Sequence, residues 1–261
     1  SNTAYVEAFT ISITDVNDQA PVWTTPATAD VAEGATAVAT MAATDTDTAD
    51  ANGLTYSITT NDPSGSVFAV SGTALTMTAQ DYETPACGSG TNSLTCVVVL
   101  AATDAGSTHS TAHTITVTIT DSNDESPTDM ALSAASAAEN AAAGTDIGTL
   151  STTDGDASGN SHVYTLVTDS GGATAYTGTD FALDSAVLEV GSSPSFDYET
   201  TTSYTVYVKV ADGSNTAYVE GFTISITDVN DQAPVWTTPA TADVAEGATA
   251  VATMAATDTD T

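Results

Sequence analysis

The segment Asp121-Ser122-Asn123-Asp124-Glu125-Ser126-Pro127 decides how the chain is organised, because it recurs as DVNDQAP at residues 15–21 and again at residues 228–234. The three copies begin 106 and 107 residues apart, a spacing that matches the size of one β-sandwich domain. Each copy follows an alternating run rich in Thr and Ile and ends in proline, which cannot continue a β-ladder. Carboxylates and an amide on a short connector are the oxygen ligands that Ca²⁺ prefers. We therefore interpret the segments as calcium-binding linkers between tandem domains.

An internal repeat underlies this spacing. Residues 1–48 and 214–261 have the same sequence except that Gly221 in the second copy stands where the first has Ala8. The chain thus holds one 213-residue period and an overlap, and such arrays favour reach and multivalency over one unique active site. The predicted domains are the last strand and linker of a preceding domain (1–19), two complete domains (20–126 and 127–233) and the start of a further one (234–261).

The fold class is predicted from many short segments rich in Val, Ile and Thr, separated by Gly, Asn and Asp. This pattern is typical of all-β proteins, and we expect tandem Greek-key β-sandwiches in a linear array. The Ala-rich segment 131–143 has helix propensity but lacks a 3.6-residue apolar period, so we predict strand and loop there. The clearest predicted strands are residues 97–100, 115–119, 163–167, 204–210 and 222–226.

The charge of the chain excludes several partners. Asp and Glu number 34 against a single basic residue, Lys209, which gives a formal net charge of −33 at pH 7. Nucleic acids and anionic membrane surfaces both require clustered Lys and Arg. The longest apolar run, residues 96–102, is too short to span a bilayer, so no membrane insertion is predicted. Such a charge opposes compaction of the chain unless cations neutralise it. A disordered chain is the alternative interpretation, but the 41 % hydrophobic content and the period-two strand patterns argue against it.

Further acids recur in the same order in both complete domains. Each domain has a Glu near its start, an Asp-x-Asp pair, an Asp-Tyr-Glu turn and an Asp that ends an apolar strand. Asp104 and Asp212 continue the core-facing parity of their strands, where an acid is costly unless it lies at the domain pole and binds a metal. The set is Glu33, Asp45, Asp47, Asp81, Glu83 and Asp104 in the first domain, and Glu139, Asp154, Asp156, Asp197, Glu199 and Asp212 in the second.

This ordered set resembles extracellular cadherin repeats, whose motifs are a Glu in the first strand, a DRE-like triplet, a DxNDNxP linker, a DxD pair and an AxD triplet. The resemblance covers the whole chain and implies three Ca²⁺ ions at each complete junction. Two departures stand out. The middle triplet residue is Tyr82 or Tyr198 instead of Arg, at a position that is not a ligand. Gln19, Glu125 and Gln232 replace the last linker Asn, whose contribution is a backbone carbonyl.

The resemblance also implies which residues hold the ions. At the middle junction, the two ion sites nearer the first domain would be formed by Glu33, Asp81, Glu83, Asp121 and Asp124. The third site would be formed by Asn123, Asp154, Asp156 and Asp212, with Asp156 bridging two ions. The backbone carbonyls of Ser122, Glu125 and Asn160 would be additional ligands. The first junction would use Asp15, Asn17, Asp18, Asp45, Asp47 and Asp104, and the last Glu139, Asp197, Glu199, Asp228, Asn230, Asp231, Asp258 and Asp260. An EF-hand starting at Asp154 is rejected, because its twelfth position is Thr165 and not Glu.

Cys87 and Cys96 bracket an eight-residue insertion that only the first domain has. We predict a disulfide that pins this loop and contributes about 2–3 kcal/mol. Metal or redox thiols are the alternative, but no CxxC motif or basic neighbour accompanies the pair.

The histidines and tryptophans are predicted to be structural. His109 and His113 lie about 13 Å apart along a strand, too far for one zinc ion. We expect both, and His162, to be turn or edge residues. Trp23 and Trp236 follow the linkers, and packing near a domain pole is favoured there over strand swapping between molecules.

The predicted function is mechanical: a calcium-rigidified repeat segment of a large extracellular adhesin or filament, acting as an adhesion stalk, in a microbial surface protein. Its partners would be calcium ions, neighbouring repeats, and like chains or a surface glycan. The alternative is a calcium-dependent binding module for polysaccharide or another cadherin-like chain. That module would need a solvent-facing aromatic cluster, for which Tyr5, Tyr176, Tyr204, Tyr207 and Tyr218 are candidates. No catalytic triad, glycosidase carboxylate pair or phosphate-binding loop is recognisable, so no enzymatic activity is predicted.

Overall fold

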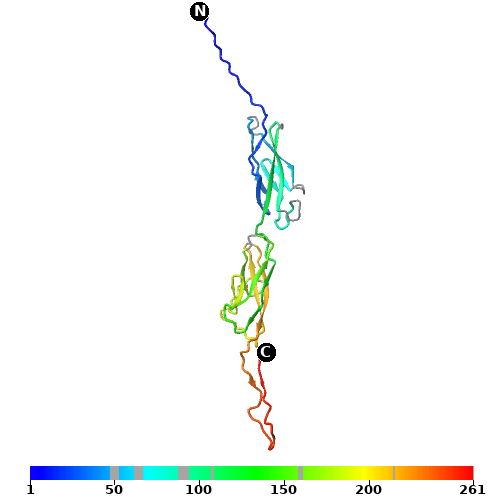
Figure 1. The fold of residues 1–261 in the computed structure, drawn as a ribbon, viewed down its shortest axis with the longest axis vertical. Coiled ribbons are helices and arrows are strands. Elements are labelled where there is room, and N and C mark those ends of the chain that lie inside the picture. Colours follow the sequence, from blue (N-terminus) through cyan, green and yellow to red (C-terminus); the bar gives the residue numbers. More distant parts are fainter. Residues whose placement is uncertain are drawn as a thin grey trace. The chain divides into compact units, whose positions relative to one another are not determined.

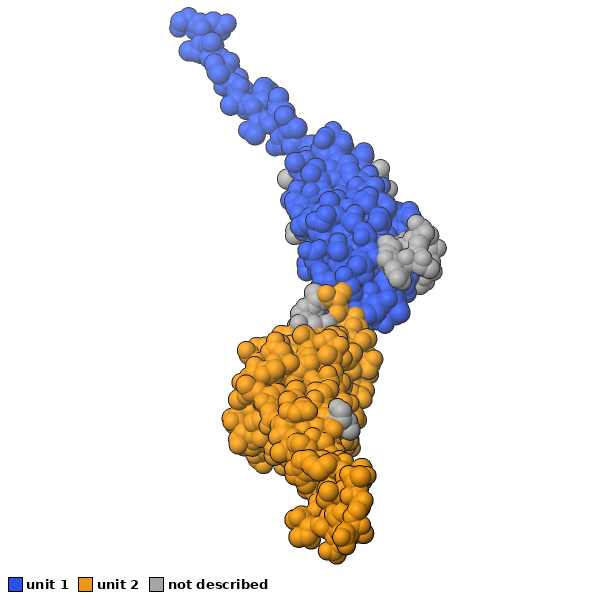
Figure 2. All heavy atoms as spheres, turned by 60° about the horizontal axis from the view of Figure 1, so that its bottom comes forward, with its two compact units in different colours: residues 1–122 blue, residues 123–261 orange. Residues whose placement is uncertain are grey.

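The computed structural model describes residues 1–47, 53–61, 67–87, 94–106, 109–157, 161–213 and 215–260. They form two compact units, residues 1–122 and 123–261 (Figure 2). Every regular element in these described ranges is a strand, as Figure 1 shows, which confirms the predicted all-β class.

Unit 1 contains two sheets and a short ribbon. The larger sheet has the order β2-β9-β8-β5, with β2 parallel to β9 and the remaining pairs antiparallel. Its strands are Thr28–Ala32, Ser110–Thr120, Thr95–Thr103 and Thr55–Thr60. The second sheet has the order β3-β7-β6, built from Ala37–Thr40, Ala74–Met77 and Phe68–Ser71. The ribbon pairs β1 (Val22–Trp23) with β4 (Ala43–Thr44).

Unit 2 repeats this plan. One sheet has the order β11-β17-β16-β13, with strands Ser136–Ala138, Tyr218–Thr227, Ser203–Ala211 and Val163–Val167. The other has the order β10-β12-β15-β14, with strands Asp129–Leu132, Asp146–Thr153, Val187–Val190 and Phe181–Asp184. A final ribbon pairs β18 (Val235–Trp236) with β19 (Ala256–Thr257). The Ala-rich segment therefore forms strand and loop, as predicted.

Alternation along the long strands builds one core between the sheets of each unit. In β16 the side chains of Val206, Val208 and Val210 are buried, while the intervening residues are partly exposed. The same parity continues past the strand end to Asp212, which is only 3 % exposed. In unit 1 it leads to Asp104, which is 1 % exposed. The sequence pattern thus brings one buried carboxylate to the pole of each sandwich.

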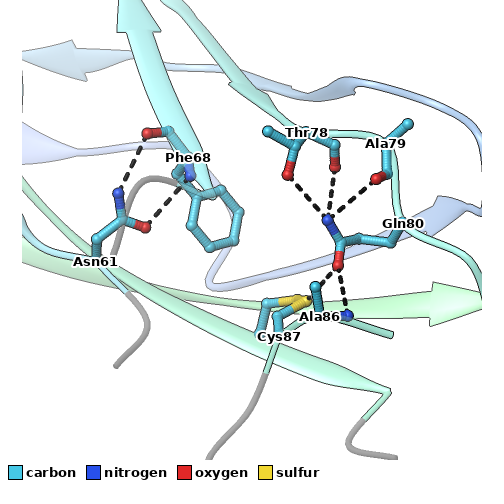
Figure 3. Close-up of a disulfide and its surroundings, with 8 residues drawn as sticks. Asn61, Phe68, Thr78, Ala79, Gln80, Ala86 and Cys87 are labelled. Atoms are coloured by element: carbon cyan, nitrogen blue, oxygen red, sulfur yellow. Dashed lines mark hydrogen bonds between the residues drawn. A yellow bond between two sulfur atoms is a disulfide. The ribbon is translucent and has the colours of Figure 1, made fainter. Parts of the chain in front are cut away.

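The predicted cysteine pair is bonded. Cys87 and Cys96 form a disulfide with a Cα–Cα distance of 5.3 Å, and both residues belong to the core of unit 1 (Figure 3). Cys96 lies in β8, and Cys87 follows the Asp-Tyr-Glu turn.

Trp23 packs against the core of unit 1, as predicted. Its ring centroid lies 5.4 Å from that of Tyr56 and 5.0 Å from that of His113, and its Nε1 donates a hydrogen bond to the Thr111 carbonyl at 3.0 Å. The same prediction for Trp236 is wrong, because this side chain is 64 % exposed. Counterparts of the strands that cover Trp23 do not follow Trp236 in the described chain.

Candidate metal centres

In unit 1 a buried glutamate joins the linker to the Asp-Tyr-Glu turn. Glu33 Oε1 accepts a hydrogen bond from the Ser122 amide at 2.6 Å, and its Oε2 accepts one from the Tyr82 amide at 2.8 Å. The Glu33 amide donates to the Thr120 carbonyl at the end of β9. The next residue, Gly34, has a φ of +70°, in the left-handed region that glycine adopts without strain. This turn directs Glu33 towards the end of the unit.

Unit 2 builds the same arrangement with different residues. Glu139 accepts hydrogen bonds from the amides of Val229 and Tyr198, both at 2.7 Å. Asn140 occupies the left-handed position with a φ of +58°, a conformation that asparagine tolerates better than most residues. Its side-chain amide donates to Asp231 Oδ2 at 2.5 Å. In both units, therefore, the glutamate binds the linker backbone to the Asp-Tyr-Glu turn at the pole.

Three carboxylates of unit 1 come together at this pole. Oxygens of Glu33, Asp81 and Glu83 all lie within 4.8 Å of one another. The Thr84 hydroxyl and amide, at 2.5 and 3.1 Å, hold the pKa of Asp81 below its usual value. Burial raises the pKa of Glu83, and the charges of Glu33 and Asp121 raise it further. The cluster therefore concentrates negative charge that its own hydrogen bonds only partly offset.

The clearest sign of a cation comes from Glu83 and Asp121. All four of their carboxylate oxygens are shielded from solvent and have no hydrogen-bond partner among the described residues. Withdrawing an ionised carboxylate from water without a partner costs several kcal/mol. A hard divalent cation removes that cost, and donors that are all oxygens match the preference of Ca²⁺. The residues present fit this ion.

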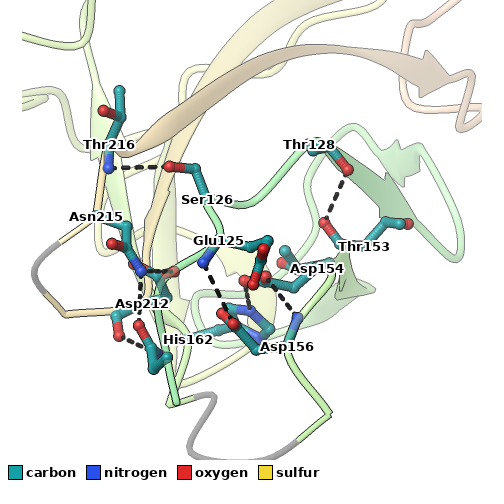
Figure 4. A network of polar contacts seen from close by, with 12 residues as sticks. Glu125, Ser126, Thr128, Thr153, Asp154, Asp156, His162, Asp212, Asn215 and Thr216 are labelled. Atoms are coloured by element: carbon teal, nitrogen blue, oxygen red, sulfur yellow. Dashed lines mark hydrogen bonds and ion pairs between the residues drawn. The ribbon is translucent and has the colours of Figure 1, made fainter. Parts of the chain in front are cut away.

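A second cluster lies at the start of unit 2, where oxygens of Asp154, Asp156 and Asp212 lie within 4.8 Å of one another (Figure 4). Asp156 Oδ1 accepts hydrogen bonds from the amides of Asp124 and Glu125, at 3.1 and 3.2 Å. Burial raises the pKa of Asp156, but hydrogen bonds from Glu125 and Asp124 outweigh it and the pKa is lowered overall. Asp156 thus remains ionised while it anchors the linker.

Side chains that the sequence did not single out support this second cluster. Asn215 donates to Asp212 Oδ2 at 3.2 Å (Figure 4). It also donates to Asn123 Oδ1 at 2.6 Å, and Asn123 donates to the Asp212 carbonyl. His162, expected to be only an edge residue, lies 3.0 Å from Asp154 Oδ2. Asn215 lies in the segment that repeats residues 1–48, but neither residue is part of an acidic motif, so those motifs could not identify them.

The linker anchor recurs at both other linkers. Asp47 Oδ2 accepts hydrogen bonds from the amides of Asp18 and Gln19, at 3.0 and 2.8 Å. Asp260 Oδ2 accepts one from the Gln232 amide at 2.8 Å. The second Asp of each Asp-x-Asp pair therefore binds the backbone of its linker.

The last junction contains two overlapping clusters. Glu199 shares one with Glu139 and Asp197 and another with Asp228 and Asp260, each with ligand oxygens within 4.8 Å. The Glu199 backbone amide lowers the pKa of its side chain, but burial and the neighbouring Glu139 and Asp260 carboxylates outweigh it, so the pKa is raised. Asp260 Oδ1 is shielded from solvent without a hydrogen-bond partner in the described ranges.

The remaining predicted ligands gather less closely. Asp15 and Asp18 are exposed, and within the described residues the carboxylates of the first junction form no cluster of three. His109 Nδ1 lies 3.3 Å from both Asn17 Oδ1 and Asp104 Oδ2, another contact that the sequence did not reveal. Asp45 Oδ1 and Asp258 Oδ1 each accept the amide of the second Asp in their pair, and Asn230 is exposed. Asn160 lies outside the described residues.

The fold and these clusters define a tandem β-sandwich protein with acid-rich poles. No protein-family model matches the sequence. Human Protocadherin-1 is 31 % identical over 240 residues, which cover 88 % of this chain and 21 % of that protein, so the chain spans about a fifth of the relative's length.

Solved structures of cadherin domains are similar to this chain in fold. Mouse Cadherin-23 EC22-24 matches with a TM-score of 0.56 and 24 % identity, covering 94 % of this chain and 79 % of that one. Mouse clustered protocadherin PcdhgC3 EC1-3 matches with a TM-score of 0.59 and 24 % identity, covering 83 % and 70 %. The chain therefore consists of cadherin-like domains. Within the described residues, no helix has the length and apolar character needed to cross a bilayer.

Proposed function

We propose that the acidic clusters bind Ca²⁺ and that the bound ions couple consecutive sandwiches into a stiff segment. Asp121, whose charge acts on Glu83 of the first cluster, and Asn123, which donates to the carbonyl of Asp212 in the second cluster, are two positions apart in the linker. Ligands on both sides of so short a connection would restrict its rotation once an ion is held. The same order of ligands returns at residues 228–234.

The observation that carries this proposal is the pair of shielded carboxylates, Glu83 and Asp121, whose oxygens have no donors among the described residues. Eight carboxylates belong to the proposed middle ligand set, so three divalent ions would leave a charge of −8 + 6 = −2. Ca²⁺ fits this set better than Mg²⁺, because many flexible oxygen ligands suit its larger and less regular shell. The number three rests on the cadherin resemblance.

The mechanical role follows from the repetition. Successive β-sandwich domains give the chain length, and ions at each joint would keep it extended. We propose an adhesion stalk or filament in a large extracellular protein, with neighbouring repeats as its first partners and like chains or a surface glycan beyond them. A microbial surface and a non-enzymatic role are parts of this proposal.

The competing binding module receives less support from the tyrosines. Tyr176, Tyr204 and Tyr218 pack against the core of unit 2 and do not form a platform open to solvent.

Calorimetric calcium titration of two matched variants tests the proposal. Glu33 and Glu246 occupy the same position of the repeat, but Glu33 is 8 % exposed within its cluster and Glu246 is exposed. Glu33→Gln should lower calcium affinity by at least tenfold, since it removes a charged ligand. Glu246→Gln should leave the isotherm unchanged. Equal isotherms for both variants and the native chain would contradict the assignment of Glu33.

A further inference from the structure

The Asp-Tyr-Glu turn is fastened to its sandwich differently in the two units. In unit 1 the turn follows Gln80, and in unit 2 the equivalent turn follows Phe196. Cys96 pairs in register with Val117, four residues before its linker, and Tyr204 pairs with Ile224, four residues before the next linker. Gln80 and Cys96 thus occupy the places of Phe196 and Tyr204.

Unit 2 fastens its turn by aromatic packing. The ring centroids of Phe181 and Phe196 lie 5.3 Å apart, those of Phe196 and Tyr204 also 5.3 Å, and those of Phe181 and Tyr204 6.0 Å. The Tyr204 hydroxyl donates to the Ser195 carbonyl at 3.2 Å. Because Phe196 directly precedes Asp197, this cluster fixes where the turn begins.

Unit 1 lacks that aromatic cluster and uses polar and covalent links. Gln80 is 6 % exposed, and its side-chain amide donates to the Thr78 carbonyl at 2.9 Å (Figure 3). Its Oε1 accepts a hydrogen bond from the Ala86 amide at 3.0 Å and lies 3.5 Å from Cys87 Sγ. Cys87 is bonded to Cys96 in β8, and both are at most 1 % exposed. The two ends of the turn therefore meet at Gln80 and at the disulfide.

We infer that the Cys87–Cys96 disulfide is a positioning element for the cation cluster of Glu33, Asp81 and Glu83. Asp81 and Glu83 lie between Gln80 and Cys87, and the Gln80 carbonyl accepts the amide of Gly34, the residue after Glu33. Without the disulfide the Cys87 end of the turn keeps the hydrogen bond from the Ala86 amide to Gln80 but loses its covalent link to β8. The carboxylates then lose the fixed spacing that cation binding requires. The inference rests on the proposed function and predicts that only the cluster of unit 1 depends on the disulfide.

Two backbone amides report on the two clusters in one sample. The Tyr82 amide donates to Glu33 and the Tyr198 amide donates to Glu139, at 2.8 and 2.7 Å. The experiment is a calcium titration followed by ¹H–¹⁵N NMR on the native chain and on the Cys87→Ser/Cys96→Ser variant. Residues that orient metal ligands typically contribute about 10- to 100-fold to metal affinity. We expect the Tyr82 midpoint to move to about tenfold higher calcium, with the Tyr198 midpoint unchanged.

The amide resonances of Val98 and Leu100 in the same spectra show whether the core of unit 1 stays folded in the variant. A second variant, Cys87→Ala/Cys96→Val, replaces the buried disulfide with apolar side chains. An unchanged Tyr82 midpoint in a folded variant would overturn the inference, and so would equal shifts of Tyr82 and Tyr198. Unfolding of unit 1 in both variants would overturn it as well, because the disulfide would then hold the core and not the turn. If neither amide responds to calcium in the native chain, the proposed function itself fails, and this inference with it.

Discussion

Residues 1–48 and 214–261 differ at one position, yet the described parts of these two copies have different structures. In the second copy, Tyr218–Thr227 forms β17, paired with β16 and β11. In the first copy, residues 5–14 have no strand partner among the described residues. Ile224 is fully buried, whereas Ile11, at the same repeat position, is 85 % exposed. The following residues reverse the comparison, because Met41 is 1 % exposed and its equivalent Met254 is 69 % exposed.

One element is common to both copies. The ribbon of Val22–Trp23 with Ala43–Thr44 reappears as Val235–Trp236 with Ala256–Thr257. Its two strands lie in the same short stretch of chain, so each copy carries both partners. β2 and β3 pair with β9 and β7, which lie outside the repeated 48 residues, and they have no equivalent after residue 236 in the described chain. Partner strands, and not local propensity, decide which parts of this sequence form sheet.

Adding partner strands to the second copy should have the largest effect. A segment of residues 1–261 followed directly by a copy of residues 49–126 gives the second copy the strands that surround residues 20–47. We expect residues 241–245 and 250–253 to form strands, with amide hydrogen exchange slowed by about 100-fold or more, since buried core strands exchange only through rare opening. An extension of equal length with scrambled sequence is the control. Unchanged exchange in the matching extension would contradict the role of partner strands.

Truncating the paired isoleucines should give the next largest difference. Ile224→Ala removes a fully buried side chain from the core of unit 2 and should cost about 2–5 kcal/mol in the free energy of unfolding. Ile11→Ala changes an exposed residue and should stay within about 0.5 kcal/mol. Urea unfolding measures both. A comparable loss in the two variants would show that residues 5–14 are packed.

The linker anchors offer a finer comparison. Asp47 is 3 % exposed and accepts two linker amides, whereas Asp260, at the same repeat position, is partly exposed and accepts the Gln232 amide. In chelator, Asp47→Asn should destabilise its unit by about 1.5–3 kcal/mol, the usual range for hydrogen bonds to charged groups. Asp260→Asn should cost less, because solvent can replace the lost contact. Thermal unfolding in EDTA measures the difference, and a larger loss for Asp260→Asn would reverse this ranking.

Acidity should produce the smallest effect. Because the pKa of Glu83 is raised in the folded chain, its contribution to stability is present below its unfolded pKa and is lost as pH rises through the folded value. In EDTA, lowering the pH from 7 to 5 should therefore raise the melting temperature of unit 1 slightly. The pKa of Asp81 is lowered in the folded chain, so Asp81 contributes stability that is lost only as the pH falls below its ordinary pKa of 3.8. It therefore does not affect the melting temperature between pH 7 and 5. With calcium present the direction should reverse, because protons compete with the ion.

The repeat motifs predicted most of this architecture. Period-two alternation located β8, β9, β13, β16 and β17, and the parity argument placed Asp104 and Asp212 at buried positions. Fixed motif order identified Glu33 and Glu139 even though each contacts residues about 50 to 90 positions away. These motifs occur in both complete domains, so they can be recognised by comparing one domain with the other.

Contacts made by residues outside the acidic motifs could not be predicted in this way. Asn215 contacts Asn123 and Asp212, and His109 lies near the equivalent Asn17 and Asp104, but an amide and an imidazole give no common sequence signal. His162 contacts Asp154. Trp236 shows the opposite error, in which repetition suggested a packing environment that depends on strands outside the repeated segment. The equivalence of Gln80 and Cys96 with Phe196 and Tyr204 could be recognised only from the strand register of β8 and β16 in the structure.

The most direct test of the central claim is a crystal structure grown in millimolar calcium, with anomalous scattering data that locate the ions. We expect anomalous density bounded by the carboxylates of Glu33, Asp81, Glu83 and Asp121, with oxygens about 2.3–2.6 Å from each ion. Density for water alone among these carboxylates, at that calcium concentration, would contradict it.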